Sequence, residues 1–218
     1  MFRIKICGLT QLADADCVAA AGADAVGLNF YARSPRCVTL PTAQAIASAL
    51  PARVLNVGLF VNETPERIRE LAEAVPLDVV QLHGDETPEA IQALADLRVM
   101  KAFRLGPGEA ARVLEFVAAC EAQHTPLAAV LVDAFHPGSY GGTGRAADWQ
   151  AALELRSNLR VPLILAGGLT AQNVAAAIVA VRPAGVDTAS GVESVPGQKD
   201  PQRVCDFAAA AQQAFQEL

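Results

Sequence analysis

The chain has 218 residues, of which 52% are hydrophobic and 18% are charged, so it can bury a large core and does not belong to the disordered class. Its formal net charge is −6, with acids and bases interspersed, which argues against the clustered basic surface of a nucleic-acid-binding protein. The length predicts a single domain that spans residues 1–218.

The five cysteines are odd in number, widely spaced and without a C-x-x-C pair. This pattern argues against a disulfide framework or a structural zinc site and is typical of a reducing cytosol. No secretory signal is visible, and charges, Gly and Pro interrupt every Ala-rich stretch. We therefore expect a cytoplasmic protein without a membrane partner, while the choice between monomer and homodimer stays open.

Along the chain, short segments rich in β-branched residues alternate with Ala-rich segments of helical spacing. The hydroxyl side chains of Thr10, Thr64 and Thr87 are predicted to cap three of the helices. The predicted strands are Phe2–Ile6, Ala25–Leu28, Val54–Val61, Asp78–Leu82, Val99–Phe103, Ala128–Val132, Pro162–Leu165 and Gly185–Asp187. The predicted helices lie near residues 11–21, 42–50, 64–74, 87–95, 108–121, 147–155, 170–180 and 200–216.

Eight strands, each followed by a helix, predict a single (β/α)₈ TIM barrel of the α/β class. The alternative is an open, doubly wound sheet. Against that alternative, no G-x-G-x-x-G follows the first strand, and eight strands are many for this length. No Pro/Gly/Ser-rich linker interrupts the pattern, which again favours one domain.

Polar residues follow most of the predicted strands at their carboxyl ends, where such barrels carry out their chemistry. Cys7 ends the first strand, and a thiol there can act as a base, a nucleophile or a metal ligand, although a buried cysteine is more often inert. The other polar strand ends include Asn29, Asn62, Gln81, His83, Arg104, Asp133 and Asp187.

Side-chain alternation sharpens this assignment. Lys5 shares a strand face with Cys7, so both point into the barrel if Ile4 and Ile6 pack on the helices. The Lys5 ammonium would then favour the thiolate, or it would form a buried ion pair with a carboxylate from another strand, and the sequence leaves both roles open.

Three glycine-containing loops follow the last three strands, where barrels of this kind often hold a phosphate group. Their backbone N–H groups can converge on an anion. The three histidines lack ligand spacing, so no metal site is indicated. Arg36 could clamp a carboxylate or be an ordinary exposed loop arginine. The glycine segments are Gly141-Gly142-Thr143-Gly144, Ala166-Gly167-Gly168-Leu169-Thr170 and Ser190-Gly191-Val192.

Short motifs in a fixed order, spread over residues 4–200, together match one known family. They are Lys5-Ile6-Cys7-Gly8-Leu9-Thr10, Ser34-Pro35-Arg36, Val57-Gly58-Leu59-Phe60-Val61-Asn62, Gln81-Leu82-His83-Gly84, Leu131-Val132-Asp133, Gly141-Gly142-Thr143-Gly144, Leu165-Ala166-Gly167-Gly168-Leu169, Asp187 with Ser190-Gly191-Val192-Glu193, and Pro196-Gly197-Gln198-Lys199-Asp200. With these motifs the chain resembles the phosphoribosylanthranilate isomerases, barrel enzymes of tryptophan biosynthesis.

The resemblance implies a role for each matching residue. Cys7 would be the general base and Asp133 the general acid, and Arg36 would bind the anthranilate carboxylate. Gln81, His83 and Asp187 would contact the rest of the substrate, with Asp187 near the ribose hydroxyls. The phosphate-binding residues would be Gly142, Gly144, Gly167, Gly168, Ser190 and Gly191. Ala189 departs from the serine pair that is usual in the family, which removes a hydroxyl but keeps the backbone amide.

The implied reaction is an Amadori rearrangement of a phosphorylated aminoaldose, which needs no cofactor and no metal because the substrate supplies its own electron sink. Two other hypotheses about function stay open. One is another phosphate-binding barrel enzyme of sugar-phosphate or indole-glycerol-phosphate chemistry, for which Lys101 would be the candidate acid although no matching glutamate set is evident. The other is a barrel that binds a phosphometabolite without catalysis.

Overall fold

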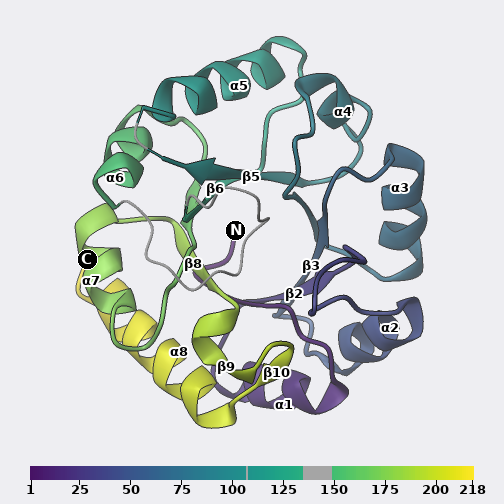
Figure 1. Cartoon of the computed structure of the whole chain (residues 1–218), viewed down its shortest axis with the longest axis vertical. Helices are drawn as coiled ribbons and strands as arrows, with labels where there is room; N and C mark the ends of the chain where they lie inside the picture. Colours follow the sequence, from purple (N-terminus) through teal and green to yellow (C-terminus); the bar gives the residue numbers. More distant parts are fainter. Residues whose placement is uncertain (107, 135–148) are drawn as a thin grey trace.

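The computed structural model describes residues 1–106, 108–134 and 149–218 and contains a closed barrel of eight parallel strands inside a ring of helices (Figure 1). The pairing of β1 with β8 closes the barrel, so the open-sheet alternative is wrong. The strands are β1 (Ile4–Cys7), β2 (Ala25–Asn29), β3 (Leu55–Phe60), β4 (Val79–Leu82), β5 (Val99–Leu105), β6 (Ala129–Ala134), β7 (Leu163–Leu165) and β8 (Gly185–Thr188). The helices are α1 (Leu12–Ala20), α2 (Leu40–Ala49), α3 (Pro65–Ala74), α4 (Pro88–Gln92), α5 (Ala110–Ala122), α6 (Trp149–Asn158), α7 (Val174–Val181) and α8 (Pro201–Gln216).

Strand alternation divides the apolar side chains between two cores. Ile4 and Ile6 belong to the outer core between the strands and the helices, as the sequence predicted. Val79 and Leu131 belong to the smaller core inside the barrel. The polar residues that follow on these inward strand faces therefore point into the barrel at the carboxyl ends of the strands. This places the polar strand ends at one rim.

The predicted helix starts are correct at two of the three threonines. Thr64 and Thr87 each accept a hydrogen bond from the backbone N–H three residues later and cap α3 and α4. Thr10 does not cap α1, which begins after Gln11 without a side-chain cap. The Thr10 hydroxyl instead donates to the carbonyl of Gly197, far along the chain.

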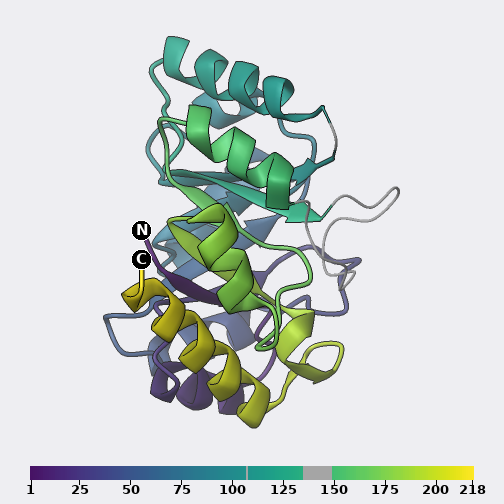
Figure 2. The same cartoon turned by 90° about the vertical axis from the view of Figure 1, so that its left-hand side faces the viewer.

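One feature after β8 is absent from the sequence prediction. A short 3₁₀ helix, η1 (Ser190–Val192), leads into an antiparallel hairpin of β9 (Glu193–Val195) and β10 (Gln198–Lys199) before α8 begins. In Figure 2 this yellow-green hairpin lies at the opposite end of the barrel from the two termini. The hairpin thus stands at the rim where the strands end.

Two findings bear on redox state and membranes. All five cysteines are free thiols. Among the described residues, every helix is too short or too polar to cross a bilayer.

Candidate active site

A cavity of about 420 Å³ opens at the carboxyl ends of the strands. Residues from the ends of β1, β4, β6, β7 and β8 line it, together with the loop that follows β2. Nine of the predicted site residues share this cavity: Cys7, Arg36, Gln81, His83, Asp133, Gly167, Gly168, Asp187 and Ser190. Gly191 does not line it, and Gly142 and Gly144 lie outside the described residues.

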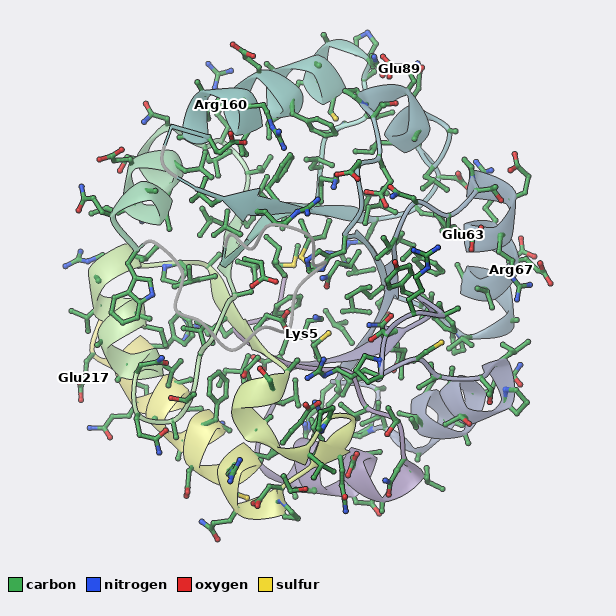
Figure 3. All side chains as sticks on the ribbon, viewed as in Figure 1. Lys5, Glu63, Arg67, Glu89, Arg160 and Glu217 are labelled. Carbon is green, nitrogen blue, oxygen red and sulfur yellow. The ribbon has the colours of Figure 1, made fainter. Side chains whose placement is uncertain are left out.

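Cys7 lies at the mouth of the barrel with Lys5 beneath it. Lys5 is fully buried, and its Nζ lies 2.9 Å from Oδ1 of Asp187. Figure 3 shows Lys5 near the centre of the ring, whereas the labelled charges of the outer helices and loops lie at the periphery. The predicted alternation is confirmed, and the structure supports both roles left open for Lys5, because it pairs with Asp187 and also neighbours the thiol.

Burial and the charge of Lys5 have opposite effects on the pKa of Cys7. Burial raises the pKa of the Cys7 thiol above its ordinary value, and Lys5 opposes this rise without cancelling it. Burial would lower the pKa of Lys5, but Asp187 and Cys7 together raise it, so the lysine stays protonated. The expected effect of Lys5 on the thiolate is therefore present, but burial is the larger influence.

Gln81, His83 and Asp133 form a second polar group that lines the cavity. Nε2 of Gln81 lies 3.1 Å from Nδ1 of His83, and Nε2 of His83 lies 3.6 Å from Oδ2 of Asp133. Nε2 of His83 and Oε1 of Gln81 are buried and have no hydrogen-bond partner among the described residues. A bound ligand can supply those partners, because buried polar atoms normally have one.

Arg36 reaches the cavity by packing against the glycine that follows Cys7. Gly8 has a φ of 79°, and a Cβ there would lie 2.5 Å from Cδ of Arg36. Glycine is therefore required for both the backbone conformation and the close approach. The guanidinium of Arg36 makes a two-pronged contact with Glu193, so it is not an exposed loop arginine.

The loops after β7 and β8 lie side by side at the rim. Gly167 and Gly168 have φ values of 89° and 65°, which favour glycine. The Thr188 hydroxyl donates to the carbonyl of Leu169, and a Cβ on Gly191 would collide with that same carbonyl. Gly191 therefore permits the close packing of the two loops.

Two charged residues contact the cavity residues Arg36 and Cys7 from outside the cavity, and the sequence predicted no role for them. Glu193 and Lys199 are 5% and 4% exposed, and both belong to the β9–β10 hairpin. Both also occur in motifs that carried the family resemblance, so that resemblance was the available signal. The side chain of Asn29, another polar strand end, lines the cavity and holds the next loop through Ser34 and the Tyr31 backbone.

Lys101, the candidate acid of the alternative barrel chemistry, lies outside the cavity. Its ammonium is 3.1 Å from Oε2 of Glu86 and donates to the carbonyls of Gly84 and Ala102. These contacts give it a structural role. Among the described residues, no group of three or more His, Cys, Asp or Glu side chains could hold a metal ion.

Comparison with known proteins gives one family. Residues 4–210 match the family model described as N-(5′-phosphoribosyl)anthranilate (PRA) isomerase. A relative of that name from Pseudomonas fluorescens is 44% identical over 99% of this chain and 98% of its own length. One from Stutzerimonas stutzeri is 47% identical over 94% of each chain.

Solved structures agree with the sequence comparison. The phosphoribosyl anthranilate isomerase of Thermotoga maritima superposes with a TM-score of 0.87 at 39% identity, covering 98% of this chain and all of that one. A second isomerase structure, in complex with reduced 1-(o-carboxyphenylamino)-1-deoxyribulose 5-phosphate, has a TM-score of 0.84 at 38% identity with the same coverage.

Proposed function

The chain belongs to the N-(5′-phosphoribosyl)anthranilate isomerase family, and we propose that it performs the Amadori rearrangement of this substrate with Cys7 as general base and Asp133 as general acid. It is an isomerase of tryptophan biosynthesis that forms 1-(2-carboxyphenylamino)-1-deoxyribulose 5-phosphate. The observation that carries the residue assignment is the shared cavity, because a thiol and a carboxyl group line it together with an arginine and two glycine loops.

The reaction begins with opening of the ribose ring. Asp133 donates a proton to the ring oxygen as the bond from that oxygen to C1′ breaks. The nitrogen lone pair forms the C1′=N bond, which gives an iminium. The cation makes the C2′ proton acidic, since it can accept the electron pair that the proton leaves behind.

Cys7 as thiolate then removes the C2′ proton and gives an enolamine. Protonation at C1′ and loss of the 2′-hydroxyl proton complete the ketose and restore both side chains. Atoms and electrons balance without a cofactor or metal. The iminium also offsets the burial that raises the pKa of Cys7, since a nearby cation favours the thiolate.

The remaining cavity residues bind and orient the substrate. Arg36 pairs with the anthranilate carboxylate, and Asp187 lies near the ribose hydroxyls. The amide nitrogen of Gln81 can donate to Nδ1 of His83, which leaves an N–H on Nε2 to donate to the substrate beside Asp133.

The phosphate end of the substrate lies against the loops after β7 and β8. Gly167, Gly168 and Ser190 line the cavity there, and Gly191 lets the two loops approach. Ala189 also lines this part of the cavity and offers its backbone N–H in place of a serine hydroxyl. Gly142 and Gly144 complete the proposed phosphate site.

The proposal also covers the chain as a whole. Residues 1–218 act as one domain in the cytoplasm on a small phosphorylated substrate, without a nucleic-acid partner. The direct test mixes purified protein with freshly generated substrate and follows the loss of anthranilate-type fluorescence. A loss that depends on protein concentration supports the proposal, and a rate equal to that without protein contradicts it.

A further inference from the structure

Arg36 forms a buried ion pair with Glu193, a residue that has no part in the chemistry described above. Nε of Arg36 lies 2.8 Å from Oε1 of Glu193, and Nη2 lies 2.6 Å from Oε2. Glu193 thus takes Nε–H and one hydrogen of Nη2 along one side of the guanidinium. Among the described residues, no hydrogen bond is made to Nη1 or to the second Nη2 hydrogen, and a carboxylate ligand prefers such an edge for a two-pronged contact.

Lys199 connects this pair to the base and to the phosphate loop. Its Nζ lies 2.8 Å from Oε1 of Glu193, 2.6 Å from the carbonyl oxygen of Cys7 and 3.2 Å from that of Ala189. An ammonium has three protons to donate, and these three oxygens use all of them. One lysine therefore joins the partner of Arg36 to the backbone at two other parts of the cavity.

The hairpin that carries Glu193 and Lys199 is fastened on several sides. Thr10 donates to the Gly197 carbonyl at the turn, and Nη1 of Arg203 donates to the backbone carbonyl of Glu193. A Cβ on Gly197 would lie 3.0 Å from the Pro35 carbonyl oxygen, so the turn also abuts the loop that carries Arg36. Figure 1 shows the hairpin in the same sector of the ring as α1 and α8.

The ionisation of Glu193 favours the ion pair with Arg36, while burial lowers the pKa of Lys199 and the charge of Glu193 opposes that decrease. Burial alone would raise the pKa of the Glu193 carboxyl, but the hydrogen bonds from Arg36 and the charge of Lys199 outweigh it and lower that pKa. Glu193 therefore stays ionised at neutral pH. A two-pronged ion pair fixes the plane of the guanidinium as well as its position.

We infer that Glu193 is a positioning residue for carboxylate recognition, acting through Arg36, and that Lys199 holds Glu193 in register with the backbone of Cys7. The inference rests on the proposed role of Arg36 as the carboxylate-binding residue. Glu193 acts by presenting the Nη1–Nη2 edge of the guanidinium to the ligand without touching the ligand itself. The two residues thereby favour substrates that carry a carboxylate on the aromatic ring.

The test measures binding of two probes to the whole protein by calorimetry. One probe is reduced 1-(o-carboxyphenylamino)-1-deoxyribulose 5-phosphate, and the other is the same compound without the carboxyl group. The quantity to compare is the dissociation constant of the probe without the carboxyl group divided by that of the carboxylated probe. This ratio isolates the contribution of the carboxylate to binding. We expect Glu193→Gln to reduce this ratio about tenfold, the effect of losing a charge-assisted hydrogen bond.

A double-mutant cycle distinguishes action through Arg36 from a general structural effect. In an Arg36→Met background, Glu193→Gln should leave the ratio unchanged. The matched control is Glu70→Gln, which removes the same charge from an exposed pair with Arg67 on α3 and should not alter the ratio. Lys199→Met, which keeps the contact of Glu193 with Arg36, is a second variant if Glu193→Gln does not fold. Because Lys199 also holds the backbone of Cys7 and Ala189, this variant should weaken both probes, and the carboxylate probe more strongly.

The inference about Glu193 is overturned by any of the following results. An unchanged ratio in Glu193→Gln overturns the inference, as does an equal loss of affinity for both probes. For a Glu193→Gln protein that does not fold, equal effects of Lys199→Met on the two probes overturn it. If Arg36→Met itself preserves the ratio, the proposed role of Arg36 fails together with the inference, whereas the assignment of Cys7 and Asp133 is judged separately by turnover.

Discussion

Lys5 and Asp187 are direct register partners on β1 and β8, the two strands that close the barrel, and their side chains form an ion pair at 2.9 Å inside it. The pair therefore joins the first strand to the last at the level just below Cys7. Because the lysine is fully buried, its charge has to be matched within the protein. One contact thus contributes to barrel closure and to the electrostatics of the proposed base.

Removing the Lys5 charge is expected to destabilise the fold strongly. Lys5→Met leaves the Asp187 carboxylate buried without its partner, and such changes cost about 3–5 kcal/mol. Urea unfolding should show this loss, while Lys5→Met combined with Asp187→Leu should lose less than the sum of the single variants. Arg67→Met, which breaks an exposed ion pair, serves as the control and should leave the unfolding midpoint unchanged. Equal midpoints for Lys5→Met and the wild type would show that the pair does not stabilise the barrel.

The close contact between Gly8 and Arg36 predicts a loss of substrate affinity. Gly8→Ala places a methyl carbon 2.5 Å from Cδ of Arg36, which has to move, and also strains a backbone with positive φ, which costs more than about 1 kcal/mol. We expect KM to rise while kcat changes little. Gly108→Ala is the matched control, because Gly108 has a φ of 81° and, in the part of the chain that the structure describes, no atom beyond its chain neighbours lies within 4 Å of the added Cβ. If both variants change KM equally, displacement of Arg36 is not the cause.

Glu193 predicts how stability responds to acid. Its pKa is lowered in the folded protein relative to the ordinary value of 4.5, so the unfolded chain binds this proton more readily. The stability that depends on the charge is present above that ordinary value and is lost as pH falls through the folded pKa. Glu193→Gln should therefore show a smaller decrease in unfolding free energy between about pH 6 and about pH 3. Parallel curves for the variant and the wild type would contradict this.

Activity should rise with pH if Cys7 acts as a thiolate. Burial raises its pKa above the ordinary value of 9.0, so most of the free enzyme carries the neutral thiol near pH 7. We expect kcat/KM to increase between about pH 6 and about pH 9, since this parameter follows the ionisation of the free enzyme. Cys205→Ala changes an exposed thiol on α8 and should keep the profile. A profile that levels off below pH 7 would mean that another group limits proton removal.

The sequence predicted the barrel well because repeated strand and helix patterns are local signals. The period-two alternation around Lys5 and Cys7 also predicted which side chains reach the interior. It could not predict the β9–β10 hairpin, because strands of two or three residues carry no periodicity. The sequence predicted Thr10 as a helix cap because the hydroxyl precedes a helical segment. Its actual partner, Gly197, is 187 residues away and could not be predicted from local sequence.

The same limit explains why the partner of Arg36 was missed. Arg36 and Glu193 are 157 residues apart, and their contact depends on the closure that brings the loop after β2 against the segment after β8. Both Arg36 and Glu193 are buried, and their ion pair fixes the orientation of Arg36. Local sequence contains no signal for a pairing of this kind.

The most direct test of the acid and base assignment compares single-turnover rates of Cys7→Ala and Asp133→Asn with the wild type. Each variant should lose turnover about 10²- to 10⁴-fold, the usual contribution of a general acid or base. Each should also bind the reduced, carboxylated product analogue within about threefold of the wild type, which places the loss in the chemical step. Near wild-type turnover in either variant would contradict the role of that residue.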